Sequence, residues 1–302
     1  RRKEIMGEFY RPELEAEACS GRCISQFEGT HRKSPTSFNP TTMNEKKNPA
    51  STQQGHWVLA AMGKRVLRPG GKELTEKLID SLNIASSDDI VEFAPGLGFT
   101  AELALKRKPH SYIGVEMDES AAAELRRTID GPDRRIIIGD AAHSGLPDAS
   151  ADKVYGEAML TMQNDRQKAA IVSEAYRLLK PGGLYGIHEM GLTPDDVSDE
   201  TKRSILRDLS SVINVNARPL TAAEWSDLLV AEGFEIVRVE TNPMHLLEAQ
   251  RVIDDEGLLR AVKIWFNILT HAEARERILA MRDTFRRHME NINAVAIVAV
   301  KK

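Results

Sequence analysis

The feature that most constrains the fold of this chain is an alternation of short apolar segments and amphipathic segments that starts at Asp89. The apolar segments have the length and composition of buried strands, and the stretches between them repeat apolar residues at helical spacing. A chain of this kind builds a mostly parallel sheet with helices on both faces. The predicted strands are 90–94, 111–116, 135–140, 153–157 and 184–189, and the predicted helices between them are 100–106, 119–128 and 167–179.

The alternation continues on both sides of this central part. A helix is expected over 72–83, and a second one over 221–232 opens with a capping box formed by Thr221 and Glu224. Two more strands follow, and they bring the expected sheet to seven strands. These strands are 234–240 and 294–300.

The segment 243–290 separates the last two predicted strands and is helical in pattern. A connection this long inside a compact domain is usually functional or disordered. Its many large apolar side chains argue against disorder. We therefore expect a helical lid over one end of the sheet, within a folded domain that spans 55–302.

The N-terminal segment 1–54 differs in composition from the rest of the chain. It is polar, rich in Ser, Thr, Asn, Pro and Lys, and without a sustained apolar period, so we expect it to be disordered. It holds both cysteines of the chain, Cys19 and Cys23. Two cysteines make neither a disulfide framework nor a complete metal site, so we expect a cytoplasmic protein without a metal.

The overall charge and hydropathy narrow the classes of partner. The 302 residues carry a net charge of −4, which argues against nucleic acid as the main partner because phosphate binding requires a basic face. No apolar run approaches the roughly 20 residues that a membrane span needs. A small-molecule partner is therefore expected, and the oligomeric state stays open.

Three features at predicted strand ends indicate a nucleotide-like cofactor. A Gly-rich turn, Glu92–Gly98, joins the first strand to the following helix, and glycine lets the backbone approach a ligand closely. Glu116 ends the second strand, where a carboxylate can accept both ribose hydroxyls. Gly139 and Asp140 end the third strand, where a carboxylate and a backbone N–H can bind adenine.

In these features the chain resembles the Rossmann-like S-adenosylmethionine-dependent methyltransferases, and in pattern the small-molecule branch with the ubiquinone and menaquinone C-methyltransferases. The resemblance covers about 72–240 and the last strand. It departs from the family's Gly-x-Gly-x-Gly turn at the first glycine, which is Ala94 here. The matching residues are Glu92, Ala94, Gly96 and Gly98 in the turn, Glu116, Asp140, Leu146-Pro147, and Leu179 to Gly183 in a Leu-Lys-Pro-Gly-Gly turn.

The resemblance implies a Rossmann-like fold, S-adenosylmethionine as cofactor and methyl transfer to an oxygen, nitrogen or carbon nucleophile. The cofactor-binding residues that it implies are Glu92, Ala94, Gly96, Gly98, Glu116, Met117, Gly139, Asp140, Ala141 and Glu157. Position beyond the strand ends makes Glu189 and His188 the candidates for a general base. The candidate substrate contacts are Gln163, His143, Trp265, Phe266 and Met244.

Several other functions remain as alternatives. A methyltransferase acting on protein or RNA would have the same cofactor site, and a non-catalytic cofactor-binding protein would have it as well. An NAD-dependent oxidoreductase fits less well because the glycines do not follow the G-x-G-x-x-G spacing. Glu92 also suits a cofactor that carries an amine better than one that carries a diphosphate.

Overall fold

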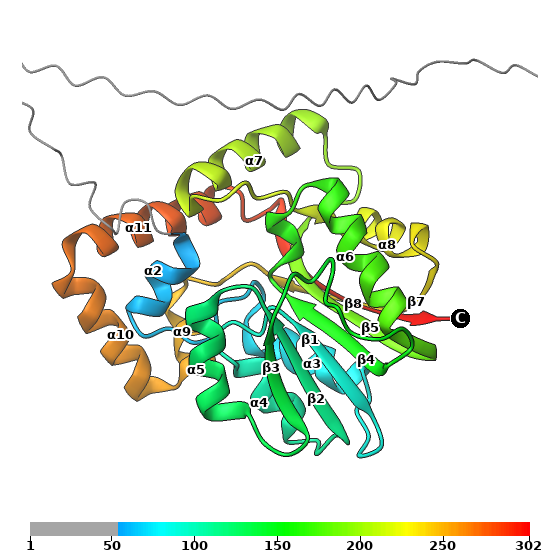
Figure 1. Cartoon of the computed structure of the whole chain (residues 1–302). Coiled ribbons are helices and arrows are strands. Elements are labelled where there is room, and N and C mark those ends of the chain that lie inside the picture. Colours follow the sequence, from blue (N-terminus) through cyan, green and yellow to red (C-terminus); the bar gives the residue numbers. More distant parts are fainter. Residues whose placement is uncertain (1–53) are drawn as a thin grey trace, which may run out of the picture. The chain divides into compact units, whose positions relative to one another are not determined.

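The computed structural model describes residues 54–302, so the expected disorder of 1–54 and both cysteines lie outside the described residues. Within this range the structure holds one sheet with strand order β3-β2-β1-β4-β5-β8-β7, and a short strand β6 pairs with β5 (Figure 1). The strands are β1 (Asp89–Phe93), β2 (Ser111–Glu116), β3 (Arg134–Ile138), β4 (Ala151–Glu157), β5 (Leu179–Leu192), β6 (Leu220–Thr221), β7 (Phe234–Pro243) and β8 (Ile292–Lys301).

The sheet confirms the mixed, mostly parallel α/β fold. Strand β8 alone runs antiparallel to its neighbours, β5 and β7, and the remaining pairs in the described part of the chain are parallel. The two-residue strand β6 was not predicted, because two residues carry no periodicity that a sequence pattern could reveal. The expected count of seven therefore becomes eight.

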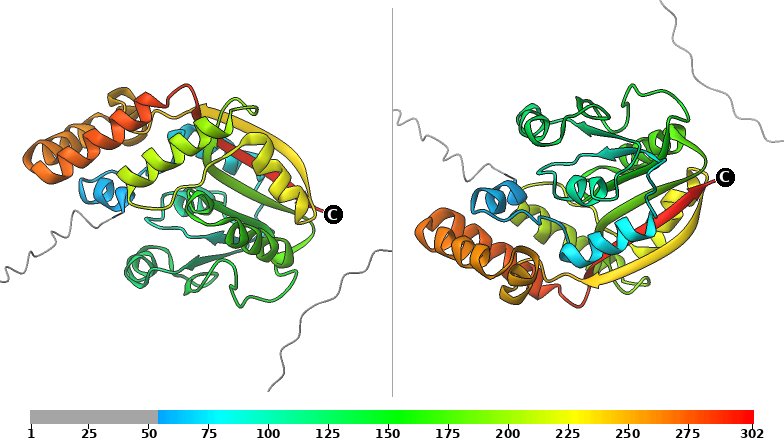
Figure 2. Two further views of the ribbon diagram at one scale, coloured as in Figure 1. Left: turned by 90° about the horizontal axis from the view of Figure 1, so that it is seen from above. Right: turned by 90° about the horizontal axis from the view of Figure 1, so that it is seen from below.

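Helices cover both faces of the sheet, as Figures 1 and 2 show. Leucines and alanines of α3 (Gly71–Ser81), α4 (Phe99–Leu105) and α5 (Glu119–Ile129) form a buried cluster on one face. On the other face, α6 (Asp165–Leu178) and α8 (Ala222–Ala231) bury a second cluster around Trp225. Burial of both faces explains why the central strands are apolar throughout rather than alternating.

A third layer of helices lies beyond the carboxyl end of the sheet. The connection from β7 to β8 contains α9 (Ala249–Glu256), α10 (Leu258–Thr270) and α11 (Ala272–Arg287). Helix α11 packs beside α2 (Gly55–Ala61) and α7 (Asp199–Ile213), and apolar residues of all three join one buried cluster (Figure 2).

Buried charges hold this layer to the linker between α2 and α3. The Lys64 ammonium lies 3.3 Å from the Asp255 carboxylate, and both side chains are 1% exposed. The Glu256 carboxylate accepts from the backbone N–H groups of Arg65 and Val66, at 2.7 Å and 2.8 Å. Loss of one partner would leave an uncompensated buried charge, so this contact fixes where the linker runs.

Helix α7 was absent from the expected elements. Its N-terminus carries recognisable signals, since the Ser198 side chain caps the helix and Asp199 and Glu200 occupy the first turn. Ile205 and Leu209 are fully buried and Val212 and Ile213 are partly buried in the same cluster, so the apolar residues of this helix also follow helical spacing. Both the cap and the apolar period therefore mark this helix in the sequence.

Candidate active site

A cavity of about 550 Å³ lies where the carboxyl ends of the parallel strands meet. It is centred between β1 and β4, which are neighbours in the sheet. From β1 the chain continues to β2 on one side, and from β4 it continues to β5 on the other side. Ligands of open α/β sheets bind at such a switch point. The cavity is therefore the candidate active site.

The backbone around the switch point is unusual. Ala94, Gly96 and Gly98 follow β1 with φ of 51°, 58° and 78°, and Ala158 follows β4 with φ of 53°. Alanine in the left-handed region costs roughly 1–2 kcal/mol, and such strain gathers at functional sites. Ala94, Gly96 and Ala158 line the cavity.

The two glycines of the turn have different roles. A Cβ on Gly96 would meet no atom within 4 Å other than the Ala94 carbonyl oxygen at 3.9 Å, so it would stand in open space at the cavity. A Cβ on Gly98 would lie 2.8 Å from a Leu125 methyl carbon. Gly98 is buried against α5 and does not line the cavity, so its expected contact with a cofactor is corrected to a packing role.

Two carboxylates at the cavity are held by backbone groups. The Glu116 carboxylate accepts from the N–H groups of Gly96 and Asp118, both at 3.0 Å, so it links the end of β2 to the Gly-rich turn. Asp140 uses Oδ1 to accept from the Ala142 N–H at 2.9 Å. Both side chains line the cavity together with Met117, Gly139 and Ala141. Their carboxylates keep lone pairs for a further donor.

Glu157, at the end of β4, is the centre of a buried polar network. Its carboxylate lies 3.0 Å from the Arg68 guanidinium, and it accepts from the Thr75 hydroxyl at 2.8 Å and from the Thr100 hydroxyl. Burial opposes ionisation, but Arg68, His188 and Thr100 together hold the pKa of Glu157 at about 2. Arg68 and Glu157 thus present one cation and one anion at the cavity.

Glu92 does not reach the cavity, which corrects its expected role beside the cofactor's amine. Its carboxylate is 3% exposed and accepts from the hydroxyls of Tyr112 and Tyr155, at 2.6 Å and 2.8 Å. Burial raises the pKa of Glu92 to about 7, against these two hydrogen bonds. Glu157, and not Glu92, lines the cavity with its carboxylate.

The base role expected of Glu189 and His188 is also corrected, because both side chains are fully buried. Glu189 accepts from the N–H groups of Met159, Leu160 and Thr161, at 2.8–3.0 Å, and so fixes the turn after β4. His188 has one ring nitrogen 2.7 Å from the Glu157 carboxylate and the other 2.6 Å from the Pro69 carbonyl oxygen. Both ring nitrogens are therefore occupied by protein partners, and His188 does not line the cavity.

Among the expected substrate contacts, Gln163 lines the cavity and four other residues do not. His143 is exposed in a turn, and Met244 is buried in the cluster between the helices of the third layer. Trp265 packs onto Val252 and its neighbours, whereas Phe266 is 64% exposed. Met244, Trp265 and Phe266 of the segment 243–290 were therefore assigned to the wrong surface.

Of the residues that line the cavity in their place, Met162 and Met190 follow predicted strands, whereas Ile213 and Val215 have no local signal. The far end of the cavity is apolar and draws on the third layer, on β5 and on the segments after β4 and α7. Its lining residues are Met162, Met190, Ile213, Val215, Leu246 and Phe285. Arg68, His56 and Trp57 also line the cavity, and only the tertiary fold brings them there.

His56 differs from the buried His188. It is partly exposed, its ring centre lies 5.1 Å from that of Trp57, and no residue of 54–302 donates to it or accepts from it in a hydrogen bond. Burial lowers the pKa of His56 below its ordinary value of 6.5. Its imidazole is therefore neutral near pH 7 and can accept a proton.

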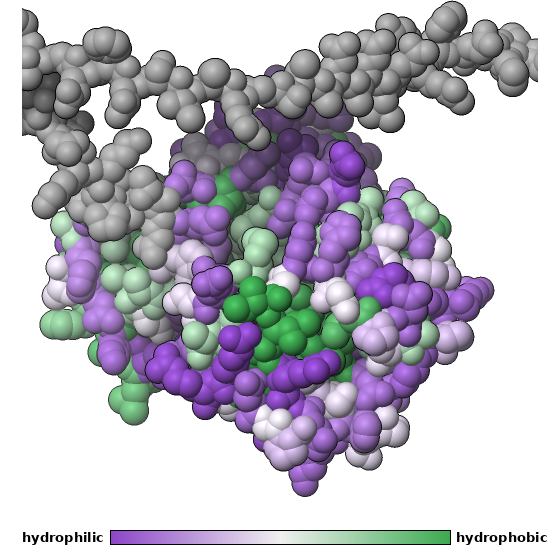
Figure 3. All heavy atoms as spheres, in the orientation of Figure 1, coloured by the Kyte–Doolittle hydropathy of each residue, from purple (hydrophilic) through white to green (hydrophobic). Residues whose placement is uncertain are grey.

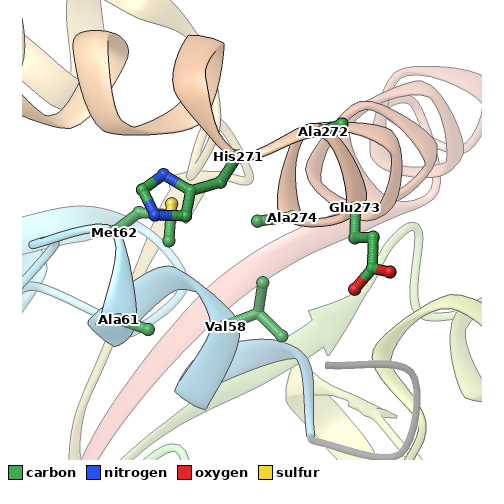
Figure 4. A pocket seen from close by; sticks show the side chains of 7 residues that line it. All are labelled: Val58, Ala61, Met62, His271, Ala272, Glu273 and Ala274. Carbon is green, nitrogen blue, oxygen red and sulfur yellow. The ribbon is translucent and has the colours of Figure 1, made fainter. Parts of the chain in front are cut away.

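Other features of the described residues are less informative. A smaller hollow of about 330 Å³ lies between α2 and the start of α11, with His271 over Met62 and Val58 opposite Ala274 (Figure 4). Within 54–302 no cluster of three His, Cys, Asp or Glu side chains could bind a metal. No helix in that range has the length and hydropathy of a membrane span.

Comparisons with known proteins concern the domain and the fold. A family model described as a methyltransferase domain matches residues 90–183. An uncharacterized protein of Haemophilus influenzae is 34% identical over 83% of this chain and 100% of its own length. A probable S-adenosylmethionine-dependent methyltransferase of Mycolicibacterium smegmatis is 31% identical over 49% of this chain and 52% of its own length. The cyclopropane synthase MmaA2 of Mycobacterium tuberculosis has a TM-score of 0.63 at 13% identity, covering 85% of this chain and 100% of that one.

Proposed function

The chain belongs to the S-adenosylmethionine-dependent methyltransferases, and from this premise we propose that it methylates a small, largely apolar molecule. The observation that carries the proposal is the division of one cavity into a polar end and an apolar end. A volume of about 550 Å³ lies within the range of small-molecule sites, roughly 300–1,000 Å³. The ubiquinone and menaquinone C-methyltransferases that the sequence resembles suggest the same kind of acceptor.

The polar end fits the cofactor. We assign the adenine to Asp140 and Gly139 and the ribose hydroxyls to Glu116, because all three residues line this cavity at strand ends. The amino-acid group of the cofactor is a zwitterion, so it suits the paired charges of Arg68 and Glu157 better than a single charge. The open space over Gly96 leaves room for the ligand beside the backbone.

The apolar end fits the acceptor. Phe285 and Leu246 come from the third layer, and Met190 comes from β5, so three distant parts of the chain close this end. Apolar walls exclude water from the reacting groups and contribute binding energy that positions the acceptor. A peptide or an RNA strand would need a groove or a basic surface instead.

The chemistry then divides between ligand and protein. When bound, S-adenosylmethionine supplies a methyl group on a positively charged sulfur, which is a good leaving group. The side chains of the apolar end hold the acceptor in line with that group. Where the acceptor atom carries a proton, His56 is the proposed base, since its neutral imidazole lines the cavity.

The experiment is a transfer assay with S-adenosylmethionine that carries a labelled methyl group. The full chain is incubated with a cell extract that has been separated into apolar metabolites, polar metabolites, protein and RNA. The proposal expects label in the apolar fraction. Label in protein or RNA would contradict the proposed acceptor, and cofactor binding without label in any fraction would favour a non-catalytic role.

A further inference from the structure

Helix α10 has an apolar surface that the rest of the described chain leaves uncovered. Five large side chains of this helix are exposed, and Leu259 is the most exposed of them at 89%. Figure 3 shows apolar side chains projecting at the lower left of the molecule, over this end of the third layer. The five residues are Leu258, Leu259, Val262, Phe266 and Leu269.

These side chains form one stripe. At 3.6 residues per turn they fall within an arc of about 100° of the helix surface. The opposite side of α10 is apolar as well, since Ala261 and Ile264 are buried against α9. The polar residues Arg260, Lys263, Asn267 and Thr270 occupy one arc of the helix, and an amphipathic helix normally turns its apolar residues toward the protein and leaves only such a polar arc exposed. The exposed stripe is therefore unexplained by the fold of the chain itself.

The two charged side chains of α10 are of one sign. Between Gly257 and Ala272 the only charged side chains are Arg260 and Lys263, and both are cations. Arg260 lies 3.9 Å from Glu256, but Lys263 is exposed and forms no ion pair with any residue of 54–302. Lys263 borders the stripe next to Leu259 on the helix surface.

The stripe is too small for a stable interface with a second copy of the chain. Helix α10 has 13 residues and is therefore about 20 Å long. An exposed face of this length that is about 10 Å wide covers only about 200 Å². A stable protein interface buries about 800 Å² on each partner. A lipid surface needs no matching partner patch, and it accepts separate projecting side chains beside cations.

We propose that α10 docks the protein onto a lipid bilayer that contains anionic headgroups. Leu259, Phe266 and Leu269 enter the boundary between headgroups and acyl chains, and Lys263 lies among the headgroups. The helix lies in the plane of the surface and does not cross it. The inference rests on the exposed face alone and not on the identity of the methyl acceptor.

The test is sedimentation of the full chain with vesicles of phosphatidylcholine and phosphatidylglycerol, compared with vesicles of phosphatidylcholine alone. The full chain is expected to sediment more with the anionic vesicles. Leu259→Ser should lower the bound fraction about tenfold, because one large exposed apolar side chain no longer enters the lipid. Lys263→Glu should weaken binding to the anionic vesicles. The fractions of this variant that sediment with the two kinds of vesicle should therefore differ much less than those of the unaltered chain.

The matched control is Val230→Ser, which removes an apolar side chain that is 52% exposed in α8, outside the stripe. It should bind as the unaltered chain does. Absence of binding to either vesicle, or equal binding of Leu259→Ser and the unaltered chain, would overturn the proposal. A dimer in solution that Leu259→Ser converts into a monomer would overturn it in favour of a second copy.

Discussion

At the scale of single residues, the turn after β1 gives the sharpest test of cofactor contact. Gly96→Val should abolish binding of S-adenosylhomocysteine, because the new side chain would occupy the open space where the cofactor lies. Gly145→Val is the matched control, since Gly145 also has a left-handed φ, of 72°, and has no atom within 4 Å of its Cβ position. Calorimetric titration and melting curves of both variants separate lost contact from backbone strain. Retained affinity in Gly96→Val would make the turn merely structural.

Asp140 has two tasks that two variants can separate. Asp140→Ala should weaken cofactor binding by about 1–3 kcal/mol and also release the Ala142 N–H. Asp140→Asn keeps an oxygen for that N–H, so its melting temperature should stay close to that of the unaltered chain. Its affinity should still fall, because an amide nitrogen can face the adenine amino group in place of an acceptor. Unchanged affinity in both variants would remove Asp140 from the site.

Glu92 gives a prediction for the pH dependence of stability. Its pKa rises from 4.5 to about 7 on folding, so the folded state disfavours its ionised form. The free energy of unfolding therefore decreases as the pH rises from 4.5 to 7, by an amount on the order of 2 kcal/mol, and levels off above that. Glu92→Gln should flatten this part of the profile, as urea unfolding at pH 5 and pH 8 would measure. An unaltered profile would mean that Glu92 titrates normally.

His56 gives a prediction for turnover. His56→Gln should lower the rate of methyl transfer about a hundredfold or more if the acceptor must lose a proton, while cofactor affinity stays the same. His110→Gln is the control, because His110 is exposed on the surface beside Asp89 and does not line the cavity. Equal rates for all three proteins would exclude His56 as the base.

At the scale of elements, Phe285 and Leu246 of the third layer line the apolar end of the cavity, whereas Trp265 and Phe266 do not. Phe285→Leu should raise the KM for the acceptor and leave cofactor affinity unchanged, because it reshapes the apolar wall. Phe266→Ala should change neither value for a soluble acceptor, since Phe266 is 64% exposed. A loss of turnover in Phe266→Ala alone would return α10 to the role of a lid over the acceptor.

Element positions could be predicted from the sequence where burial imposes a period. The strands β1 and β2 were placed within one residue, because continuous apolar runs mark strands that are covered on both faces. The start of β5 was missed, since the strand begins at Leu179 and includes the Lys-Pro-Gly-Gly turn. Helix α7 was missed although its cap and its apolar period are both present in the sequence.

At the scale of the whole molecule, local motifs predicted residues that line the polar end of the cavity but few of those that line its apolar end. Ala94, Gly96, Glu116 and Asp140 sit on strand ends that any sheet of this kind brings together. Glu189 and His188 also lie in a strand near its carboxyl end, yet both side chains are already hydrogen-bonded to other segments of the chain. The sequence cannot reveal these bonds, since their partners are 30 and 119 residues away along the chain.

The central claim is that one cavity binds the cofactor at its polar end and the acceptor at its apolar end. A crystal structure of the full chain with S-adenosylhomocysteine tests it most directly. The account predicts adenine beside Asp140, ribose on Glu116, the amino-acid group between Arg68 and Glu157, and the sulfur facing Met190 and Phe285. S-adenosylhomocysteine bound elsewhere, or in this cavity with its sulfur turned away from the apolar end, would contradict the account.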